Sequence, residues 1–424
     1  MAEGFITRRG AVGAAPLEIN GQEIISGEYA ETIAKFDTVF LEENFESSNK
    51  LNDPSSLAND DSNGFSFSKD GNYAAFAQGT SPFVNIYKRD GNTFTKLPNP
   101  STLPTGFGLY TQFSNNGNYL VVAHANSPFI TIYKRDGDNF NKLPNPSVLP
   151  ANVARNVAFS KDDQYMAIGN NGSPGIIIYK RNGDTFNNLT TPANIASSAK
   201  CSFSPNNEFL AVGWNTSGAF EAVRVYKNVN DVFTKIANVG SQPTTSSPDF
   251  MNPTSVDFSP DGNFFAVSFG GLNQYPRIRV WQKKPGLDQF AHFTDPPSPT
   301  GNTITSCVYS DDGLFLMSTP QGSPFLEMYS INENNEYTKI NPFNTIPTGG
   351  SKFETRAEFG DGKNLIGISR SSTPFVNFYE NVFENTISKS NNEISKSKHL
   401  GYALEDGTEG QEKTMMSLFR SSTW

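Results

Sequence analysis

Short apolar runs and polar turns alternate along most of the chain, and the pattern returns after 46 residues. Residues 67–103 read FSKDGNYAAFAQGTSPFVNIYKRDGNTFTKLPNPSTL, and residues 113–149 read FSNNGNYLVVAHANSPFITIYKRDGDNFNKLPNPSVL. A third copy begins at Phe159. A fixed period of this size indicates a repeat architecture, in which every copy is one structural unit.

Each copy contains four segments typical of β-strands. In the first copy a strand ends at Phe67-Ser68, apolar strands follow at residues 73–77 and 84–87, and a weaker, more polar strand covers residues 93–97. The Asp-Gly and Asn-Gly pairs between such runs favour hairpins, because these residues tolerate positive φ. One repeat is therefore predicted to be a four-stranded antiparallel meander that buries its faces against neighbouring copies.

Two aromatic positions recur and count the copies. The aromatic residue that ends the first strand is found at Phe67, Phe113, Phe159, Phe203, Phe258, Tyr309 and Phe359. The aromatic residue that closes the third strand is found at Tyr87, Tyr133, Tyr179, Tyr226, Trp281, Tyr329 and Tyr379. Seven units of four strands, each about 45 residues long, predict an all-β fold, a seven-bladed β-propeller.

The repeats resemble those of the WD40 family over residues 45–390. The segment Phe258-Ser-Pro-Asp-Gly262 is similar to that family's first hairpin turn, and Val280-Trp281 to the end of its third strand. The Gly-His pair and the Asp after the Trp, both typical of the family, are absent from these repeats. The resemblance implies the propeller fold, whereas propellers carry many unrelated functions.

Two segments compete for the last strand of the seventh blade. The first candidate is the segment of residues 43–57. Its second half, residues 50–57 (KLNDPSSL), lies 46 positions before residues 96–103 (KLPNPSTL), so the segment matches a fourth strand with no first three strands before it. Residues 382–388 directly follow the last third strand and are the alternative. We expect the N-terminal segment to close the ring, which removes an exposed sheet edge.

The predicted domains are an N-terminal arm (1–42), the propeller (43–390), and a linker with a C-terminal segment (391–424). Residues 388–398 (SKSNNEISKSK) have the polar composition of a linker. Since either closure brings the two ends of the propeller together, the arm and the C-terminal segment are expected to form one small β-domain. Insertion of one domain into another at neighbouring termini is physically easy.

The two flanks carry a second resemblance. Met1 to Gly10 (MAEGFITRRG) is similar to the openings of phage and prophage tail proteins, and residues 31–39 and 400–410 resemble small β-domains that decorate virions. The resemblance implies a non-enzymatic virion structural protein of a phage tail, baseplate or capsid surface. It further implies that the propeller is displayed for host-surface or protein binding.

The partners implied by this resemblance are other virion structural proteins and a host receptor or glycan, within a homo-oligomeric symmetric assembly. The expected localisation is the virion, after synthesis in the host cytoplasm. A cytosolic propeller scaffold for protein–protein interaction is the alternative, and a propeller hydrolase is a third interpretation.

The composition argues against several classes of function. The net charge of −9 and the pI of about 5.0 argue against a nucleic-acid-binding surface. The sequence contains neither a run of 18 apolar residues nor a visible signal peptide, so membrane insertion is not expected. Cys201 and Cys307 occupy equivalent positions in non-adjacent blades, which predicts buried free thiols instead of a disulfide.

Motifs for catalysis or metal binding are not apparent. His124, His292 and His399 occupy non-equivalent positions, and neither a phosphate-binding loop nor a nucleophile elbow is present. The Asp-Gly carboxylates are expected to stabilise turns; they are Asp70, Asp261, Asp312 and Asp361. No enzymatic activity, cofactor or metal is therefore expected. A hydrolase would need a metal or paired carboxylates in the central channel.

The order of strands in a blade assigns recurring residues to two faces. The a–b and c–d turns share the candidate distal binding face, whose residues are Lys88, Arg89, Lys134, Arg135, Lys180 and Arg181. The opposite candidate face carries the Ser-Pro-Phe loops, with Phe83, Phe129, Phe325 and Phe375. The basic pairs are either solvated turn residues or a docking site for an acidic neighbour. The phenylalanines either pack between blades or bind a partner protein or sugar.

Overall fold

The chain is an all-β protein whose repeats form seven four-stranded blades. The structure, a computed structural model, describes residues 17–19, 22–29, 38–54, 56, 60, 62–192, 195, 199–215, 222–236, 239, 252–270, 277–299, 303–345, 356–360, 362, 364–370, 375–389, 401–402 and 412–417. Within these ranges, all of the regular secondary structure is β-strand. No helix in this part of the chain has the length and apolarity needed to cross a membrane.

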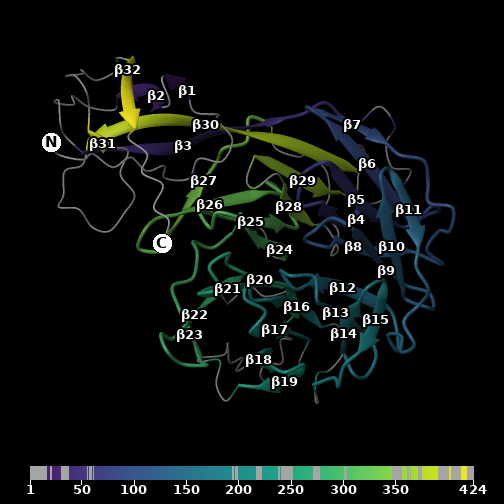
Figure 1. Ribbon diagram of the computed structural model, residues 1–424. Helices are drawn as coiled ribbons and strands as arrows, with labels where there is room; N and C mark the ends of the chain where they lie inside the picture. Colours follow the sequence, from purple (N-terminus) through teal and green to yellow (C-terminus); the bar gives the residue numbers. More distant parts are fainter. Residues whose placement is uncertain are drawn as a thin grey trace. The chain divides into compact units, whose positions relative to one another are not determined.

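Six blades are separate antiparallel sheets, each made of four consecutive strands. Blades one to three comprise β4 (Ser62–Phe67), β5 (Tyr73–Gln78), β6 (Val84–Asp90) and β7 (Thr93–Lys96); β8 (Gly108–Phe113), β9 (Tyr119–His124), β10 (Ile130–Asp136) and β11 (Asn139–Lys142); and β12 (Ala154–Phe159), β13 (Tyr165–Asn170), β14 (Ile176–Asn182) and β15 (Thr185–Asn188). Blades four to six comprise β16 (Lys200–Phe203), β17 (Phe209–Gly213), β18 (Val223–Val229) and β19 (Val232–Lys235); β20 (Asn252–Phe258), β21 (Phe264–Gly270), β22 (Ile278–Lys283) and β23 (Phe290–His292); and β24 (Ile304–Tyr309), β25 (Phe315–Pro320), β26 (Glu327–Ile331) and β27 (Tyr337–Ile340). The first strands of the blades lie innermost and the fourth strands outermost (Figure 1).

The seventh blade takes its fourth strand from the N-terminal side, as predicted. It contains β28 (Ala357–Gly360), β29 (Leu365–Ser369), β30 (Val376–Lys389) and β3 (Thr38–Lys50), which pairs with β30. The Leu51 N–H donates to the Phe378 carbonyl at 2.8 Å, and both side chains join one apolar cluster with Phe65 of blade one. The competing segment 382–388 is a continuation of β30, so the alternative closure is wrong.

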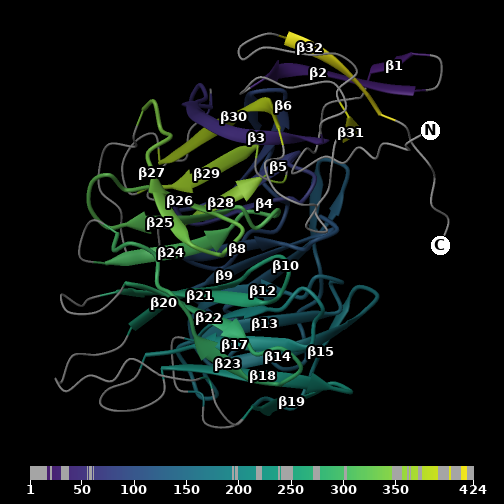
Figure 2. The same cartoon turned by 90° about the vertical axis from the view of Figure 1, so that its left-hand side faces the viewer.

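The flanks pair with one another in a second compact unit, made of residues 1–48 and 381–424. Its strands include β1 (Leu17–Ile19), β2 (Gln22–Tyr29), β31 (Gly401–Tyr402) and β32 (Glu412–Ser417). The β2 strand runs antiparallel to β32, from Glu23 opposite Ser417 to Glu28 opposite Glu412, and the two lie side by side in Figure 2. The boundaries of this flank unit fall within β3 and β30, because both strands run on from the seventh blade. The N-terminal boundary lies six residues after the predicted one at 42, and the C-terminal boundary lies ten residues before the predicted one at 390.

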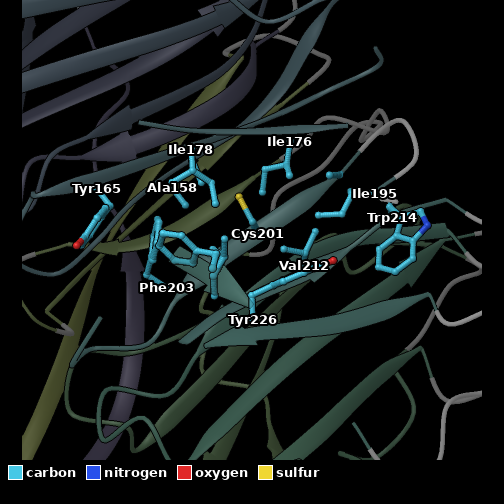
Figure 3. Packing of buried hydrophobic residues seen from close by; sticks show 14 residues of the cluster. Ala158, Tyr165, Ile176, Ile178, Ile195, Cys201, Phe203, Val212, Trp214 and Tyr226 are labelled. Carbon is cyan, nitrogen blue, oxygen red and sulfur yellow. The ribbon is translucent and has the colours of Figure 1, made fainter. Parts of the chain in front are cut away.

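Apolar side chains are buried in the interfaces between blades. In blades three and four, Tyr165 and Ile178 pack with Cys201, Phe203 and other members of one cluster (Figure 3). The aromatic residue that closes each third strand is at most 2% exposed in all seven blades. A buried phenol or indole needs a hydrogen-bond partner. Accordingly, the Tyr133 hydroxyl donates to the Thr102 carbonyl at 2.8 Å, which ties the third strand to the loop before its blade.

The a–b turns are built as the sequence predicts. In blade one, Ser68 Oγ donates to Asp70 Oδ1, which also accepts the Asn72 N–H, and Gly71 has a φ of 66°. Asp261 and Asp312 make the same contacts in their blades, whereas Asp361 lies outside the described residues. The recurring carboxylates therefore fix backbone geometry.

Candidate binding sites on the propeller

The lysines of the predicted distal face are joined to the next blade. Lys88 Nζ lies 2.8 Å from Asp138 Oδ2, and the hydroxyl of Tyr73 donates to Asp138 Oδ1 at 2.5 Å. The same Tyr-Lys-Asp arrangement recurs at the next two junctions: Tyr119, Lys134 and Asp184, then Tyr165, Lys180 and Asp231. Each lysine directly follows the recurring aromatic residue of a third strand, and each aspartate occupies the c–d turn of the following blade.

This arrangement shifts the pKa values of its aspartates, lysines and tyrosines. The hydrogen bonds from Lys88 and Tyr73 hold the pKa of Asp138 below its usual value, and the bond to Asp184 raises the pKa of Lys134. Burial, together with the bond to Asp138, raises the pKa of Tyr73 to about 12. The Lys88 side chain nevertheless remains 48% exposed, so a partner can still reach it.

The arginines of the same face also contact their own chain. The Arg135 guanidinium lies 4.7 Å from the centre of the Tyr73 ring and 3.6 Å from Asp70 Oδ2. Arg181 lies over the Tyr119 ring at 5.5 Å, and Arg89 Nε donates to the Gly91 carbonyl at 2.6 Å. All six basic residues thus belong to blades one to three, where the structure gives them intramolecular contacts that hold neighbouring strands and blades.

The Ser-Pro-Phe phenylalanines are half-buried. Phe83, Phe129, Phe325 and Phe375 all have φ between 62° and 69°. The Phe83 N–H donates to the Thr80 carbonyl at 2.8 Å, which closes the b–c turn. Phe129 packs against the cluster between blades two and three, and Phe375 against that between blades seven and one. Packing between blades therefore buries part of each of these two rings.

Four exposed apolar side chains lie at a–b or c–d turns of blades four to six. Val229 and Val232 flank the c–d turn of blade four and are 54% and 56% exposed. Leu287 in the c–d turn of blade five is 50% exposed, and Leu314 in the a–b turn of blade six is 39% exposed. The exposure of these four side chains is not apparent from the sequence, since valine and leucine next to turns look like ends of buried strands.

The inner strands enclose a cavity of about 280 Å³ along the central channel. Asp257 of blade five and Glu358 of blade seven line it. Asp257 Oδ2 accepts the Tyr309 N–H at 2.8 Å, and Glu358 Oε2 accepts the Phe67 N–H at 3.0 Å. Burial raises the pKa of Asp257 to about 7 and that of Glu358 to about 8.

These carboxylates share their inter-blade role with two serines. Ser66 Oγ accepts the Phe113 N–H at 2.9 Å, and Ser202 Oγ accepts the Phe258 N–H at 3.3 Å. In all four cases the residue before the first-strand aromatic bonds to the aromatic residue of the next blade. The sequence gives no signal for Asp257 and Glu358, because this position varies between copies and only ring closure brings its residues together.

The remaining candidate residues lie apart from one another. His124 is fully buried in β9, with Nε2 3.0 Å from Thr131 Oγ1, and burial lowers its pKa to about 4. His292 Nε2 lies 2.8 Å from Asp295 Oδ1 in blade five, and His399 is outside the described residues. Cys201 and Cys307 are buried free thiols, as predicted. Within the described ranges, no group of three or more His, Cys, Asp or Glu side chains is placed to hold a metal ion.

Comparison with known proteins supports the fold alone. No family model matches the sequence, and no curated protein matches it. Among solved structures, a chain of a mitotic checkpoint complex is 14% identical with a TM-score of 0.57, and the match covers 78% of this chain and 93% of that one. Hydrazine synthase of Kuenenia stuttgartiensis is 12% identical with a TM-score of 0.55, over 77% and 97% of the two chains.

A protein of Bacteroides uniformis, proposed to be a 6-phosphogluconolactonase, is 16% identical with a TM-score of 0.50, over 65% and 82% of the chains. Similarities at this level of identity carry no function from one propeller to another.

Proposed function

We propose that the chain is a non-enzymatic binding protein whose propeller is held on a virion, at a phage tail, baseplate or capsid surface, by its flank unit. The observation that carries the proposal is the pairing of β2 with β32, which builds a separate unit from the two ends of the chain. The flank resemblance supports a virion origin, although most of its residues lie outside the described ranges. Its partners would be other virion proteins through the flank unit.

The propeller would bind a host-surface receptor or a protein through its turn face. The exposed side chains of Val229, Val232 and Leu287 support this choice, because apolar groups grouped on one exposed face favour protein contacts. The lysines of blades one to three lie on the same face, and Lys180 reaches Asp231 in the turn between Val229 and Val232. They add positive charge that favours an acidic partner. Blades four to six would supply the apolar contacts.

The first test is electron microscopy and protein analysis of particles made by cells that express the chain. We expect the chain in purified particles, and density for a propeller joined to the particle through the flank unit. A chain that stays in the cytosol with cellular partners would support a scaffold instead, and purified particles that lack the chain would refute the virion proposal.

The second test addresses the face. Val229→Asp with Val232→Asp should abolish binding of particles to host cells while the melting temperature changes by less than about 2 °C, since both side chains are largely exposed. Val148→Asp is the matched control, because Val148 is also exposed but lies in a d–a loop, away from the a–b and c–d turns. This variant should leave binding intact. Equal loss in both variants would contradict the assignment of the turn face.

A propeller hydrolase is the second candidate, and Asp257 with Glu358 is the observation that favours it. Two carboxyl groups with raised pKa in one cavity are a feature of general acid–base sites. Against it, each group has one oxygen occupied by an inter-blade N–H. Hydrolysis of aryl esters, lactones or aryl glycosides that is lost in both Asp257→Asn and Glu358→Gln would establish this candidate in place of the first.

A further inference from the structure

Arg356 is a buried cation in the central channel. The residue is 4% exposed, its Nη1 donates to the Thr305 carbonyl at 2.5 Å, and its Nη2 donates to the Thr254 carbonyl at 2.9 Å. Its Nε is buried without a hydrogen-bond partner. Among the described residues, none of the ion pairs involves Arg356. The part of the chain that the structure describes therefore supplies no counter-anion to this guanidinium, although a buried charge is costly unless it is paired.

The cavity has room and further donors beside this guanidinium. Arg356, Tyr110 and Gln112 all line it, and the Tyr110 ring centre lies 5.4 Å from the guanidinium carbon. Gln112 Nε2 makes only long contacts of 3.5 Å, to Ser66 Oγ and the Phe113 carbonyl. Contacts of this length are weak, so the amide can turn to a ligand. A volume of about 280 Å³ holds several water-sized groups.

We propose that the central channel binds a small oxyanion, either phosphate or a short organic carboxylate, with Arg356 as its charge partner and Gln112 as a second donor. A planar guanidinium with a free N–H suits the oxygens of both anions. The site is independent of the virion proposal, because it concerns the channel and not the turn face or the flank unit.

The carboxyl groups of the channel set the pH dependence. Burial raises the pKa of Asp257 to about 7 and of Glu358 to about 8, and each group ionises as the pH passes its pKa. The ionised forms repel an anion, so the affinity should fall between pH 7 and pH 9. Tyr110, Tyr309, Cys201 and Cys307 also line the cavity, and they stay neutral in this range because burial raises their pKa. Lys161 lines it as a further cation, and burial lowers its pKa. Asp311 also faces the cavity and is paired with Lys69.

The test is isothermal titration of the full chain with inorganic phosphate and, separately, with succinate at pH 6.5 and constant ionic strength. We expect saturable binding of at least one, with an affinity about tenfold lower at pH 9 than at pH 7. Preference for phosphate or for succinate would identify which source of oxyanion the site takes. The Arg356→Met variant should lose binding at least tenfold, whereas Lys284→Ala, at an exposed lysine of the turn face, should retain it.

Glu358→Gln should bind at pH 6.5 and show a shallower pH dependence than the unmodified chain. If Arg356→Met does not fold, titration of the unmodified chain at pH 8 in two buffers of different ionisation enthalpy decides, since binding should take up protons. Absence of saturable binding, unchanged binding in Arg356→Met, or absence of proton uptake at pH 8 would each overturn the proposal. The virion and host-binding tests would be unaffected by any of these results.

Discussion

Lys88 Nζ lies 2.8 Å from Oδ2 of Asp138, a residue fifty positions further along the chain and in the next blade. The spacing is fifty again between Lys134 and Asp184. These pairs join the rim of one blade to the rim of the next, and a partly buried tyrosine hydroxyl also donates to each aspartate. The basic residues proposed from the sequence as a binding face therefore also connect the blades.

Charge reversal separates these two roles at Lys134. Lys134→Asp places two carboxylates together and should lower the melting temperature by roughly 2 °C, an effect that shrinks in 1 M salt. The double variant Lys134→Asp with Asp184→Lys should recover the stability, because the opposite charges are restored. Differential scanning calorimetry measures the stability, which reports on the connection between blades. Binding of particles to host cells measures the role of Lys134 in binding a partner. Recovery of stability without recovery of binding would show that Lys134 also meets a partner.

Because His124 is buried, we expect the free energy of unfolding of the chain to fall in acid. Burial lowers its pKa from 6.5 to about 4 in the folded chain, so its contribution is present above pH 6.5 and is lost as the pH falls toward 4. The full loss corresponds to about 3 kcal/mol. His124→Gln should remove this part of the acid sensitivity, and it matches Gln78, the equivalent residue of blade one. Urea denaturation at pH 7 and pH 4.5 tests it; equal acid losses in both chains would contradict the assignment.

Asp257 predicts the opposite dependence. Its pKa is raised from 3.8 to about 7 on folding, so its contribution to stability is fully present below pH 4 and is lost as the pH rises through 7. Asp257→Asn keeps an oxygen that can accept the Tyr309 N–H and cannot ionise. The unmodified chain should lose about 2 kcal/mol relative to this variant between pH 5 and pH 8. Parallel stability curves for the two chains over this range would count against a buried carboxylate in the channel.

The two thiols provide a test of blade packing. Burial raises the pKa of Cys201 and of Cys307 to about 12, so neither thiolate forms near neutral pH. The native chain should react with a thiol reagent at pH 8 at least a hundredfold more slowly than a free thiol, and both thiols should react once guanidinium unfolds it. Rapid reaction of one thiol in the native chain would indicate that its blade interface opens.

The fold was predictable from the sequence because each repeat carries its own signals. The aromatic positions and Asp-Gly turns return at a constant spacing. The same spacing identified residues 43–57 as the closing segment, and this segment overlaps the end of the observed strand β3 (Thr38–Lys50) without covering its beginning. The Lys88–Asp138 pair was also within reach, since both residues recur one period later. The channel was not, because Asp257 and Glu358 are 101 positions apart and no local rule relates them. Exposure at Val229 likewise depends on the turn, which the apolar pattern alone does not show.

Phe83 tests whether the Ser-Pro-Phe face binds a partner or only packs. Its φ of 65° is costly for any residue with a Cβ and is free for glycine. Phe83→Ala and Phe83→Gly both remove the ring, but the glycine variant also relieves the backbone, so it should be more stable than the alanine variant by about 1 kcal/mol. Urea denaturation measures the difference.

The glycine variant can then separate function from stability at this face. If its stability is close to that of the unmodified chain and host binding is retained, Phe83 serves the b–c turn alone. If binding falls while stability holds, the ring contacts a partner. An alanine variant as stable as the glycine variant would show that Phe83 does not hold the left-handed conformation in solution.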